Sequence, residues 1–455
     1  MVQNSTKQVI VASLSSLLTA AAIVASGCGK NLWMYYFNYN GGSVTDADFG
    51  ILSGLSANCF SAAIGALVGG LLADRYGRRN TFSLSMLLFL LGVGVTATST
   101  SFAQLATGVF VTGLAAGATV SSSWTYIAEV SEPEHRGRNI TISQLAWGLG
   151  AAGVLWLSTA NAPGSYMYSF VKWAACDVYG ITWNESNPAQ VSVFGIRLIF
   201  GVIYVIGLVT WVLQRQIPES EAFTREVEIN QGKGTGIRHA FVHVMGPKYR
   251  KALNAITWMY LLWNLVASLM GSFQPHLYET AGNLPTEVAD RFNVWQWVLT
   301  CLLTLWGAFI IDKKSHKKLF LYFISCGILA WLLVTVFGIG NIPMLILITV
   351  LWGAQAGISV QLFFALWGTE VFPTKYRATA MGMMFCVVRV VCTITNVGFS
   401  SLWGDPNAVT PTMFTACSAL MLLILVFSAV IGYRYAPDTA GKSLEDISHE
   451  RYDNK

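Results

Sequence analysis

The chain has 455 residues, of which 54% are hydrophobic and only 11% are charged, and its formal net charge at pH 7 is +5. A soluble core of this size cannot bury so much apolar surface, so the composition excludes an ordinary soluble protein and indicates a chain that lies in a lipid bilayer.

Apolar segments recur along the chain, and each is long enough to cross a hydrocarbon core of ~30 Å as a helix. We predict an all-α, multi-pass protein of the plasma or inner membrane with twelve transmembrane helices. The predicted spans are residues 8–37, 46–72, 81–99, 102–128, 139–160, 194–214, 252–276, 292–311, 318–338, 343–371, 378–402 and 412–434. Most of the 28 lysines and arginines fall in loops on the side that both termini share. The positive-inside rule therefore places both termini in the cytoplasm, and the net charge reflects topology rather than a nucleic-acid partner.

The first span carries a lysine at an unusual place. Lys30 follows Gly27-Cys-Gly29, and the glycines permit a break in the helix. A charged side chain inside a span is costly and is a functional hypothesis by default. The alternative is that Lys30 lies at the outer interface, with its ammonium group in water.

Three sequence features recur in the same order along the chain. The first is an aspartate followed by basic residues: Asp74 in Gly70-Leu-Leu-Ala-Asp74-Arg75-Tyr-Gly77-Arg78-Arg79 is matched by Asp312 in Asp312-Lys313-Lys314-Ser-His-Lys317-Lys318. The second is the spacing from Glu129 to Arg136, which is repeated from Glu370 to Arg377. The third is Pro218-Glu219-Ser220, which is matched by Pro437-Asp438-Thr439. These features predict two related six-helix halves, an arrangement typical of secondary transporters with a site between the halves. We expect a first bundle at 1–214, a cytoplasmic linker at 215–251, a second bundle at 252–435 and a cytoplasmic tail at 436–455.

With these motifs the chain resembles the major facilitator superfamily over nearly its whole length. The Gly70 to Arg79 segment resembles the signature loop of that superfamily, and the Glu129, Pro218, Glu370 and Pro437 motifs resemble its sugar-porter and metabolite-symporter branches. The resemblance implies two pseudo-symmetric six-helix bundles and transport of a small solute by alternating access. The double glutamine of sugar porters in span seven is missing, since that span reads Trp263-Asn264-Leu-Val-Ala-Ser268. We expect no enzymatic activity, no cofactor and no metal site, and function as a monomer.

The charged residues beside the loops predict a conformational latch. A carboxylate at a helix end pairs with nearby arginines in one conformation and separates from them in another. The predicted members are Gly70, Asp74, Arg75, Gly77, Arg78, Arg79, Glu129, Arg136, Arg138, Asp312, Glu370 and Arg377. The alternative for any single arginine is a topology determinant.

Arg389 is the second basic residue deep in a span. It follows Arg377 by twelve residues, about 18 Å along a helix, which places it near mid-membrane in span eleven. Two basic groups in a cavity predict an organic anion as the substrate, because a guanidinium can hold a carboxylate with two hydrogen bonds. The alternative for Arg389 is a structural pairing with backbone carbonyls.

Aromatic and amide side chains complete the predicted substrate site. With Arg389 and Lys30, the candidates are Tyr35, Tyr36, Trp124, Gln144, Trp147, Trp263, Asn264, Gln361, Trp367 and Asn396. Each aromatic residue taken alone is more often ordinary packing or interface belt.

Proton coupling needs a group that titrates within reach of the pathway. The candidates are Asp46, Asp48, His276 and Glu279, with solvated helix ends as the alternative for each. Two other functions stay open: a proton-coupled sugar or polyol porter, which the peripheral motifs favour and the cavity charges disfavour, and a non-transporting nutrient sensor.

Overall fold

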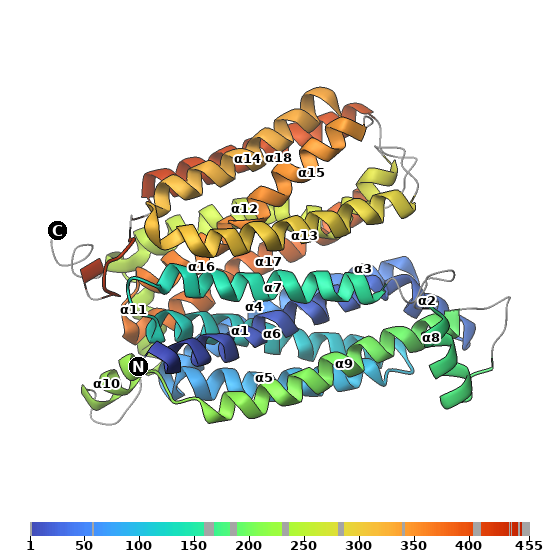
Figure 1. Cartoon of the computed structure of the whole chain (residues 1–455), viewed down its shortest axis with the longest axis horizontal. Helices are drawn as coiled ribbons and strands as arrows, with labels where there is room; N and C mark the ends of the chain where they lie inside the picture. Colours follow the sequence, from blue (N-terminus) through green and yellow to red (C-terminus); the bar gives the residue numbers. More distant parts are fainter. Residues whose placement is uncertain are drawn as a thin grey trace.

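The structure is a computed structural model that describes residues 2–56, 59–158, 168–182, 189–229, 236–280, 286–338, 342–403, 411–435, 437, 439–444 and 446–447. Within these residues the secondary structure is helical throughout (Figure 1). The first bundle contains α1 (Val2–Cys28), α2 (Lys30–Tyr39), α3 (Asp46–Leu55), α4 (Phe60–Tyr76), α5 (Arg78–Ala97), α6 (Phe102–Val130), α7 (Arg136–Ser158) and α9 (Ala189–Gln216), with the short α8 (Tyr168–Trp173) before α9.

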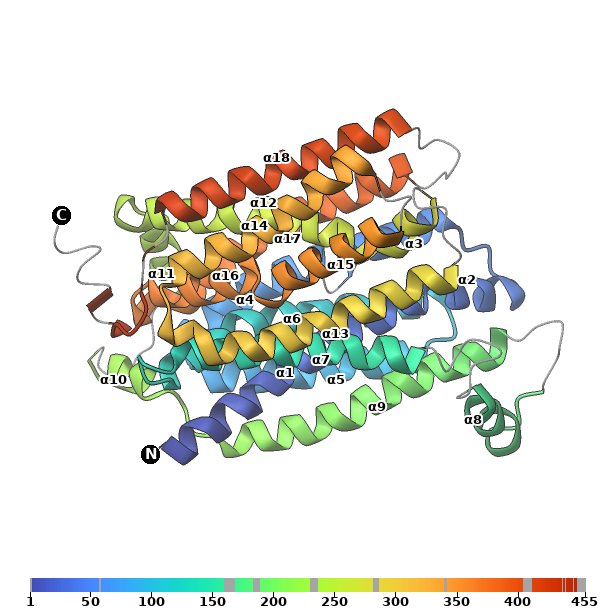
Figure 2. The same cartoon turned by 45° about the horizontal axis from the view of Figure 1, so that its top comes forward.

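Two short helices, α10 (Glu221–Ile229) and α11 (Ile237–Val244), connect the bundles. The second bundle contains α12 (Pro247–Thr280), α13 (Thr286–Ile310), α14 (His316–Phe337), α15 (Ile342–Gly357), α16 (Val360–Glu370), α17 (Arg377–Trp403) and α18 (Pro411–Tyr435). A one-turn helix, η4 (Thr374–Tyr376), precedes α17. The long helices run side by side along the long axis of the molecule (Figures 1 and 2).

Eleven helices in the described residues are long and apolar enough to cross a membrane. The remaining predicted span, the second, is divided into α3 and α4, neither of which reaches that length alone. The first span is divided at Gly29 and the tenth between α15 and α16, where the Ser359 hydroxyl accepts a hydrogen bond from the backbone N–H of Leu362 and so begins α16. The twelve-helix, two-bundle architecture predicted from the sequence is confirmed.

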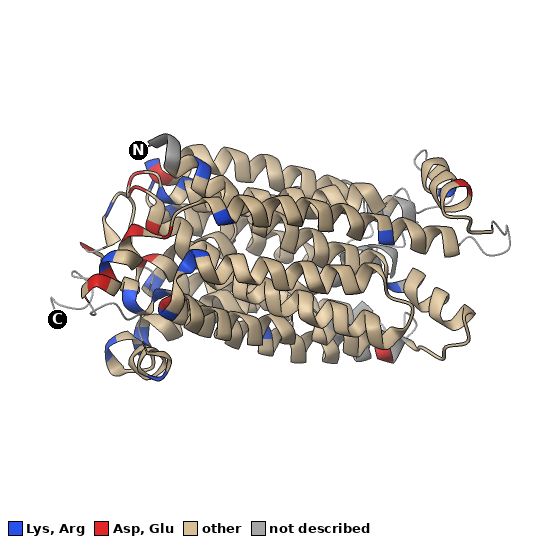
Figure 3. Ribbon diagram, turned by 90° about the horizontal axis from the view of Figure 1, so that it is seen from below, with Lys and Arg blue, Asp and Glu red and all other residues tan. Residues whose placement is uncertain are grey.

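Most charged residues lie toward one end of the molecule, which also carries both termini (Figure 3). We call this the charged end and the other the opposite end. The bilayer disfavours unpaired charge, so most charged residues lie at helix ends and in loops, and Arg389 in the middle of α17 is an exception.

The two bundles are in backbone contact along α4 and α17. A Cβ atom at Gly70 would collide with the carbonyl oxygen of Ala378, and one at Gly382 would collide with the carbonyl oxygen of Ala66. Small residues at helix interfaces allow such close approach in membrane proteins. Gly70, a member of the predicted latch, therefore lies where the backbones of α4 and α17 touch.

Candidate functional site

Arg389 lies at the centre of a polar cluster between the bundles. Its side chain is buried, with 3% of the residue exposed. Nη1 donates to Oδ1 of Asn264 at 3.2 Å and Nη2 donates to the hydroxyl of Tyr260 at 3.4 Å. The guanidinium carbon lies 4.4 Å from the ring centroid of Phe385, within the range of a cation–π contact.

The cluster continues as a chain of hydrogen bonds into the first bundle. The Tyr260 hydroxyl donates to Oε1 of Gln361 at 3.3 Å, and Nε2 of Gln361 donates to Oε1 of Gln144 at 2.9 Å. Gln144 belongs to α7 and Gln361 to α16, so this bond joins the two bundles. The chain presents amide and hydroxyl groups, which both donate and accept hydrogen bonds.

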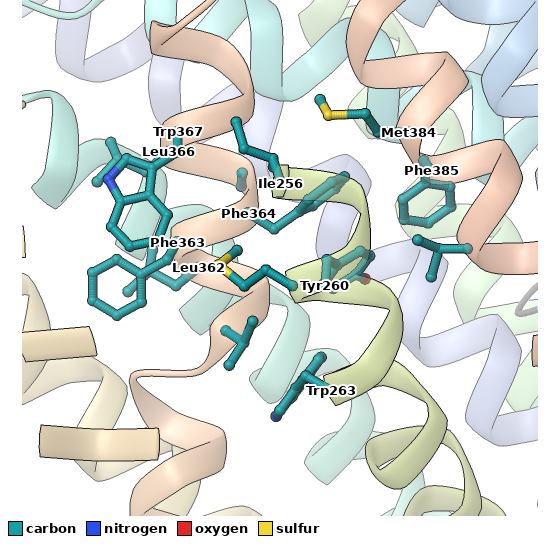
Figure 4. Close-up of a cluster of buried hydrophobic side chains, with 14 of the residues drawn as sticks. Ile256, Tyr260, Trp263, Leu362, Phe363, Phe364, Leu366, Trp367, Met384 and Phe385 are labelled. Atoms are coloured by element: carbon teal, nitrogen blue, oxygen red, sulfur yellow. The ribbon is translucent and has the colours of Figure 1, made fainter. Parts of the chain in front are cut away.

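Tyr260, one member of this chain, lies among other aromatic side chains, including Trp263, Phe364 and Phe385 (Figure 4). The ring of Tyr260 stacks on that of Phe364 with centroids 3.9 Å apart, and Trp263 stacks on Tyr260 at 5.8 Å. Trp124 of the first bundle places its edge against Phe364 and Phe385 of the second, at 6.3 and 6.4 Å. The rings limit the space around the polar groups, and the contacts of Trp124 join the first bundle to the second.

A second polar contact lies one to two turns further along α17. Nδ2 of Asn396 donates to the hydroxyl of Ser268 at 2.8 Å and points to the sulfur of Cys59, in the first bundle, at 3.7 Å. Cys392 donates to Oδ1 of Asn264 at 3.2 Å. Asn396 therefore joins the bundles as Gln361 does.

The structure brings several predicted site residues together and places others elsewhere. Arg389, Asn264, Gln361, Gln144, Trp124 and Trp263 form the central cluster. Trp367 packs inside the second bundle against Phe320 and Phe363, with ring centroids 5.4 and 5.1 Å away. Trp147 is half-buried on α7.

The predicted residues of the first span lie on a separate helix segment. Lys30 is the first residue of α2, and Tyr35 on that helix is 48% exposed. The ring of Tyr36 lies under the guanidinium of Arg197, which also lies over Trp33. These contacts fix α2 to α9.

Sequence reasoning missed Tyr260, Phe364 and Phe385. A signal was present, since Tyr260 precedes Asn264, and Phe385 precedes Arg389, by one helical turn. Residues four apart on a helix share a face. Extending the search one turn from each polar residue finds Tyr260 and Phe385.

The charged end carries a network in which each bundle supplies partners to the other. Oε1 of Glu129 in the first bundle lies 2.8 Å from Nη1 of Arg377 in the second, and Oε1 of Glu370 in the second lies 3.1 Å from Nη1 of Arg136 in the first. The four side chains are almost fully buried. Arg78 adds a second partner to Glu129, with Nε 3.1 Å from Oε2.

The two aspartates of the repeated loops also bind the opposite bundle, each at the start of a helix. Asp74 accepts hydrogen bonds from the backbone N–H groups of Ala378 and Thr379, at 3.3 and 2.7 Å, at the start of α17. Asp312 accepts from the backbone N–H of Arg138, at 3.0 Å, at the start of α7. A carboxylate at a helix N-terminus satisfies free N–H groups and the positive end of the helix dipole. Asp74 also pairs with Arg78 at 3.0 Å.

In the third repeated feature, a hydroxyl group donates a hydrogen bond to the paired glutamate of each bundle. Ser220 donates to Oε2 of Glu129 at 2.6 Å, and Thr439 donates to Oε2 of Glu370. Glu219, which sequence reasoning did not assign to the network, accepts from the backbone N–H groups of Arg78 and Arg79 at 3.1 and 3.0 Å.

Three other predicted latch residues have distinct positions. Gly77 has φ +104°, a conformation that side-chain-bearing residues rarely adopt. Arg79 donates to the carbonyl oxygen of Arg215. Arg75 is exposed and lies over the ring of Tyr76, outside the buried pairs.

Of the proton-coupling candidates, Asp48 lies in the first turn of α3. Its Oδ2 accepts from the backbone N–H and hydroxyl of Thr45, at 2.8 and 2.7 Å, which is a helix-start arrangement. The side chains of Asp46, His276 and Glu279 lie outside the described residues.

Comparison with known proteins gives consistent matches. The profile of the Major Facilitator Superfamily matches residues 12–396. The chain is 31% identical over 450 residues to the minor myo-inositol transporter IolF of Bacillus subtilis, covering 98% of this chain and 94% of the relative. It is 25% identical over 426 residues to the glucose transporter GlcP of Staphylococcus epidermidis, covering 86% and 87%.

Among solved structures, the proton:xylose symporter XylE bound to 6-bromo-6-deoxy-D-glucose superposes with a TM-score of 0.77. Its sequence identity to this chain is 17%, and the superposition covers 99% of each chain. At this identity the similarity shows the fold.

Proposed function

The chain belongs to the Major Facilitator Superfamily and is a secondary transporter rather than an enzyme, and we propose that it carries a neutral polyol or sugar. The observation that carries this proposal is the chain of side chains from Gln144 through Gln361 and Tyr260 to Asn264 and Arg389 at the boundary of the bundles. Amides and hydroxyls match the hydroxyl groups of a polyol, because both sides donate and accept. Relatives named for myo-inositol and glucose support the same substrate class.

This proposal replaces the organic anion predicted from the sequence. The two relatives described above are named for neutral compounds, myo-inositol and glucose. The guanidinium of Arg389 already contacts Asn264, Tyr260 and Phe385. We propose that Arg389 fixes the orientation of Asn264 and Tyr260 toward the substrate. Its charge keeps a carboxylate-bearing solute as the second candidate.

We propose that the charged end faces the cytoplasm and that the Glu129–Arg377 and Arg136–Glu370 pairs hold it closed. In this scheme residues 1–214 and 252–435 rock against each other, while 215–251 connects them and 436–455 forms the tail. Opening the charged end toward the cytoplasm requires both reciprocal pairs to separate, which fits a two-state latch. The similarity to a proton symporter supports a proton gradient as the driving force.

Uptake into proteoliposomes tests the proposal. Radiolabelled myo-inositol and glucose are the reporter substrates, with unlabelled polyols, sugars, monocarboxylates and dicarboxylates as competitors. We expect competition by polyols or sugars and none by carboxylates. Competition confined to carboxylates would overturn the substrate class. A protonophore should abolish accumulation, and insensitivity would remove the proton gradient while leaving the substrate class intact. Binding without uptake would indicate a sensor.

A further inference from the structure

A short helical segment at the opposite end of the molecule lies apart from the transport site. It consists of α8 (Tyr168–Trp173) and the π-helix η2 (Ala174–Val178), and it lies beside the end of α9 that begins at Ala189 (Figures 1 and 2). Gly180, with φ +69°, follows the segment. We call residues 168–179 the outer segment.

One face of the outer segment packs against α9. Tyr168, Val171 and Ala175 are buried and form a hydrophobic cluster with Val191 and Phe194 of α9. This cluster fixes which side of the outer segment faces the protein. The residues on the other side form an outward face.

The outward face is apolar as well. Phe170, Trp173, Val178 and Tyr179 are between 54% and 70% exposed. The rings of Phe170 and Trp173 touch each other, with centroids 5.9 Å apart. A surface helix in water normally carries polar residues on the side that faces away from the protein. Several large apolar side chains exposed together instead indicate an apolar partner for this face.

The position of α9 in the bilayer sets the depth of the outer segment. The membrane span within α9, Gln190–Gln216, has 27 residues. At 1.5 Å per residue it is about 40 Å long, which is the thickness of a bilayer with its headgroup regions. Val191 and Phe194, which contact the outer segment, lie in the first two turns of this span. The outer segment therefore lies where the headgroups meet the acyl chains.

The outward face also continues a surface that lipid covers. α9 lies at the edge of the helix assembly in both views (Figures 1 and 2), and Val205 in the middle of its span is exposed. An exposed valine at this depth is covered by acyl chains, because water is excluded from the hydrocarbon core. Lipid that covers α9 thus reaches the adjacent outer segment.

We propose that the outer segment is a membrane anchor whose outward face inserts into the interface of the lipid bilayer at the opposite end. Tryptophan and tyrosine are enriched at this level of membrane proteins, because their rings are apolar and their N–H or O–H group reaches water. The anchor holds the adjoining end of α9 at a fixed depth. This inference does not depend on which solute the protein carries.

The charges of the outer segment indicate which force holds it to the bilayer. Its charged residues are Lys172 and Asp177, whose charges cancel. Binding to anionic headgroups requires an excess of basic residues. The attachment therefore depends on burial of apolar side chains, and phosphatidylcholine alone is sufficient for it.

Photo-crosslinking of the full-length protein in phosphatidylcholine vesicles tests the anchor. Trp173→p-benzoylphenylalanine places a photoreactive ring on the outward face. The same substitution at Val205 is the positive control, and at Asn40, exposed at the end of α2, it is the negative control. After irradiation, mass spectrometry should find phospholipid adducts at 173 and 205, with a yield at least roughly fivefold above that at 40. Adducts at 205 but not at 173, or equal yields at 173 and 40, would overturn the proposal.

A photoreactive lipid gives a second measurement on the unchanged protein. Phosphatidylcholine with a diazirine near the headgroup end of one acyl chain should modify Phe170, Trp173 or Tyr179. Modification of α9 without modification of the outer segment would contradict the anchor. Adding phosphatidylglycerol should leave the yield unchanged. Labelling that occurs only when phosphatidylglycerol is present would show that charge, and not apolar burial, holds the segment to the bilayer, and the proposal would fail.

Discussion

Oε1 of Glu129 and Nη1 of Arg377 are 2.8 Å apart although 248 residues separate them in the chain. The equivalent pair, Arg136 and Glu370, has the bundles exchanged. The glutamate and arginine that recur with the same spacing in each half therefore do not pair with each other within one bundle. Each glutamate reaches the arginine of the other bundle, so the repeat produces a reciprocal contact between bundles.

The first prediction concerns this pair. Glu129→Gln leaves the buried guanidinium of Arg377 without its carboxylate, and breaking a buried pair in this way typically costs about 3–5 kcal/mol. We expect a lower unfolding temperature in detergent and strongly reduced uptake. Arg75→Gln is the matched control, because Arg75 is exposed and should change neither quantity. An unchanged unfolding temperature in Glu129→Gln would show that the pair does not stabilise this conformation.

The central amide chain gives a second prediction. Gln361→Ala removes the bond to Gln144 and leaves the Tyr260 hydroxyl without its acceptor. If these groups bind the substrate, loss of a hydrogen-bonding partner costs about 1–3 kcal/mol, so KM for the transported polyol should rise roughly 5- to 150-fold. Gln104→Ala changes a half-buried amide in the first turn of α6, outside the central cluster, and should leave KM unchanged. Equal KM values for the two variants would place the substrate elsewhere.

Substitutions of Arg389 give a third prediction, because they distinguish a role in orienting its neighbours from a role of its positive charge. Arg389→Lys keeps the positive charge but has a single ammonium group in place of the fork that reaches both Asn264 and Tyr260. If Arg389 orients these residues, Arg389→Lys and Arg389→Ala should lose polyol uptake to a similar extent. Full retention of uptake in Arg389→Ala would contradict the orienting role, and carboxylate uptake that survives only in Arg389→Lys would favour the anionic substrate.

Helix contact between the bundles gives a fourth prediction. A methyl group at Gly70 would collide with the backbone of α17, so Gly70→Ala should force α4 and α17 apart at the charged end. We expect reduced uptake and increased labelling of cysteines introduced at the charged end. Gly201→Ala is the control, because no atom lies within 4 Å of a Cβ at that position. Identical labelling of the two variants would show that this contact does not control access.

The sequence predicted the parts of the molecule that depend on local pattern. The apolar segments predicted the spans because lipid requires continuous apolar helices, and the Gly70 to Arg79, Glu129 and Glu370 motifs predicted the family and fold. The same reasoning favoured an organic anion over a sugar or polyol, since Lys30 and Arg389 were treated as two charges in one cavity without knowledge of their neighbours. Relatives named for myo-inositol and glucose support the sugar or polyol alternative better. The structure instead begins α2 with Lys30 and surrounds Arg389 with Asn264, Tyr260 and Phe385.

By itself, therefore, the sequence determined the membrane architecture and the existence of two related halves, because hydrophobic length and repeated spacing are properties of the chain alone. Only the tertiary structure decided which partners meet. Glu129 pairs with Arg377, and Gln144 with Gln361, through side chains that come from different bundles. Such contacts depend on how two rigid helix bundles pack against each other, and that packing is set by small residues such as Gly70 and Gly382 acting together with all the others at the interface.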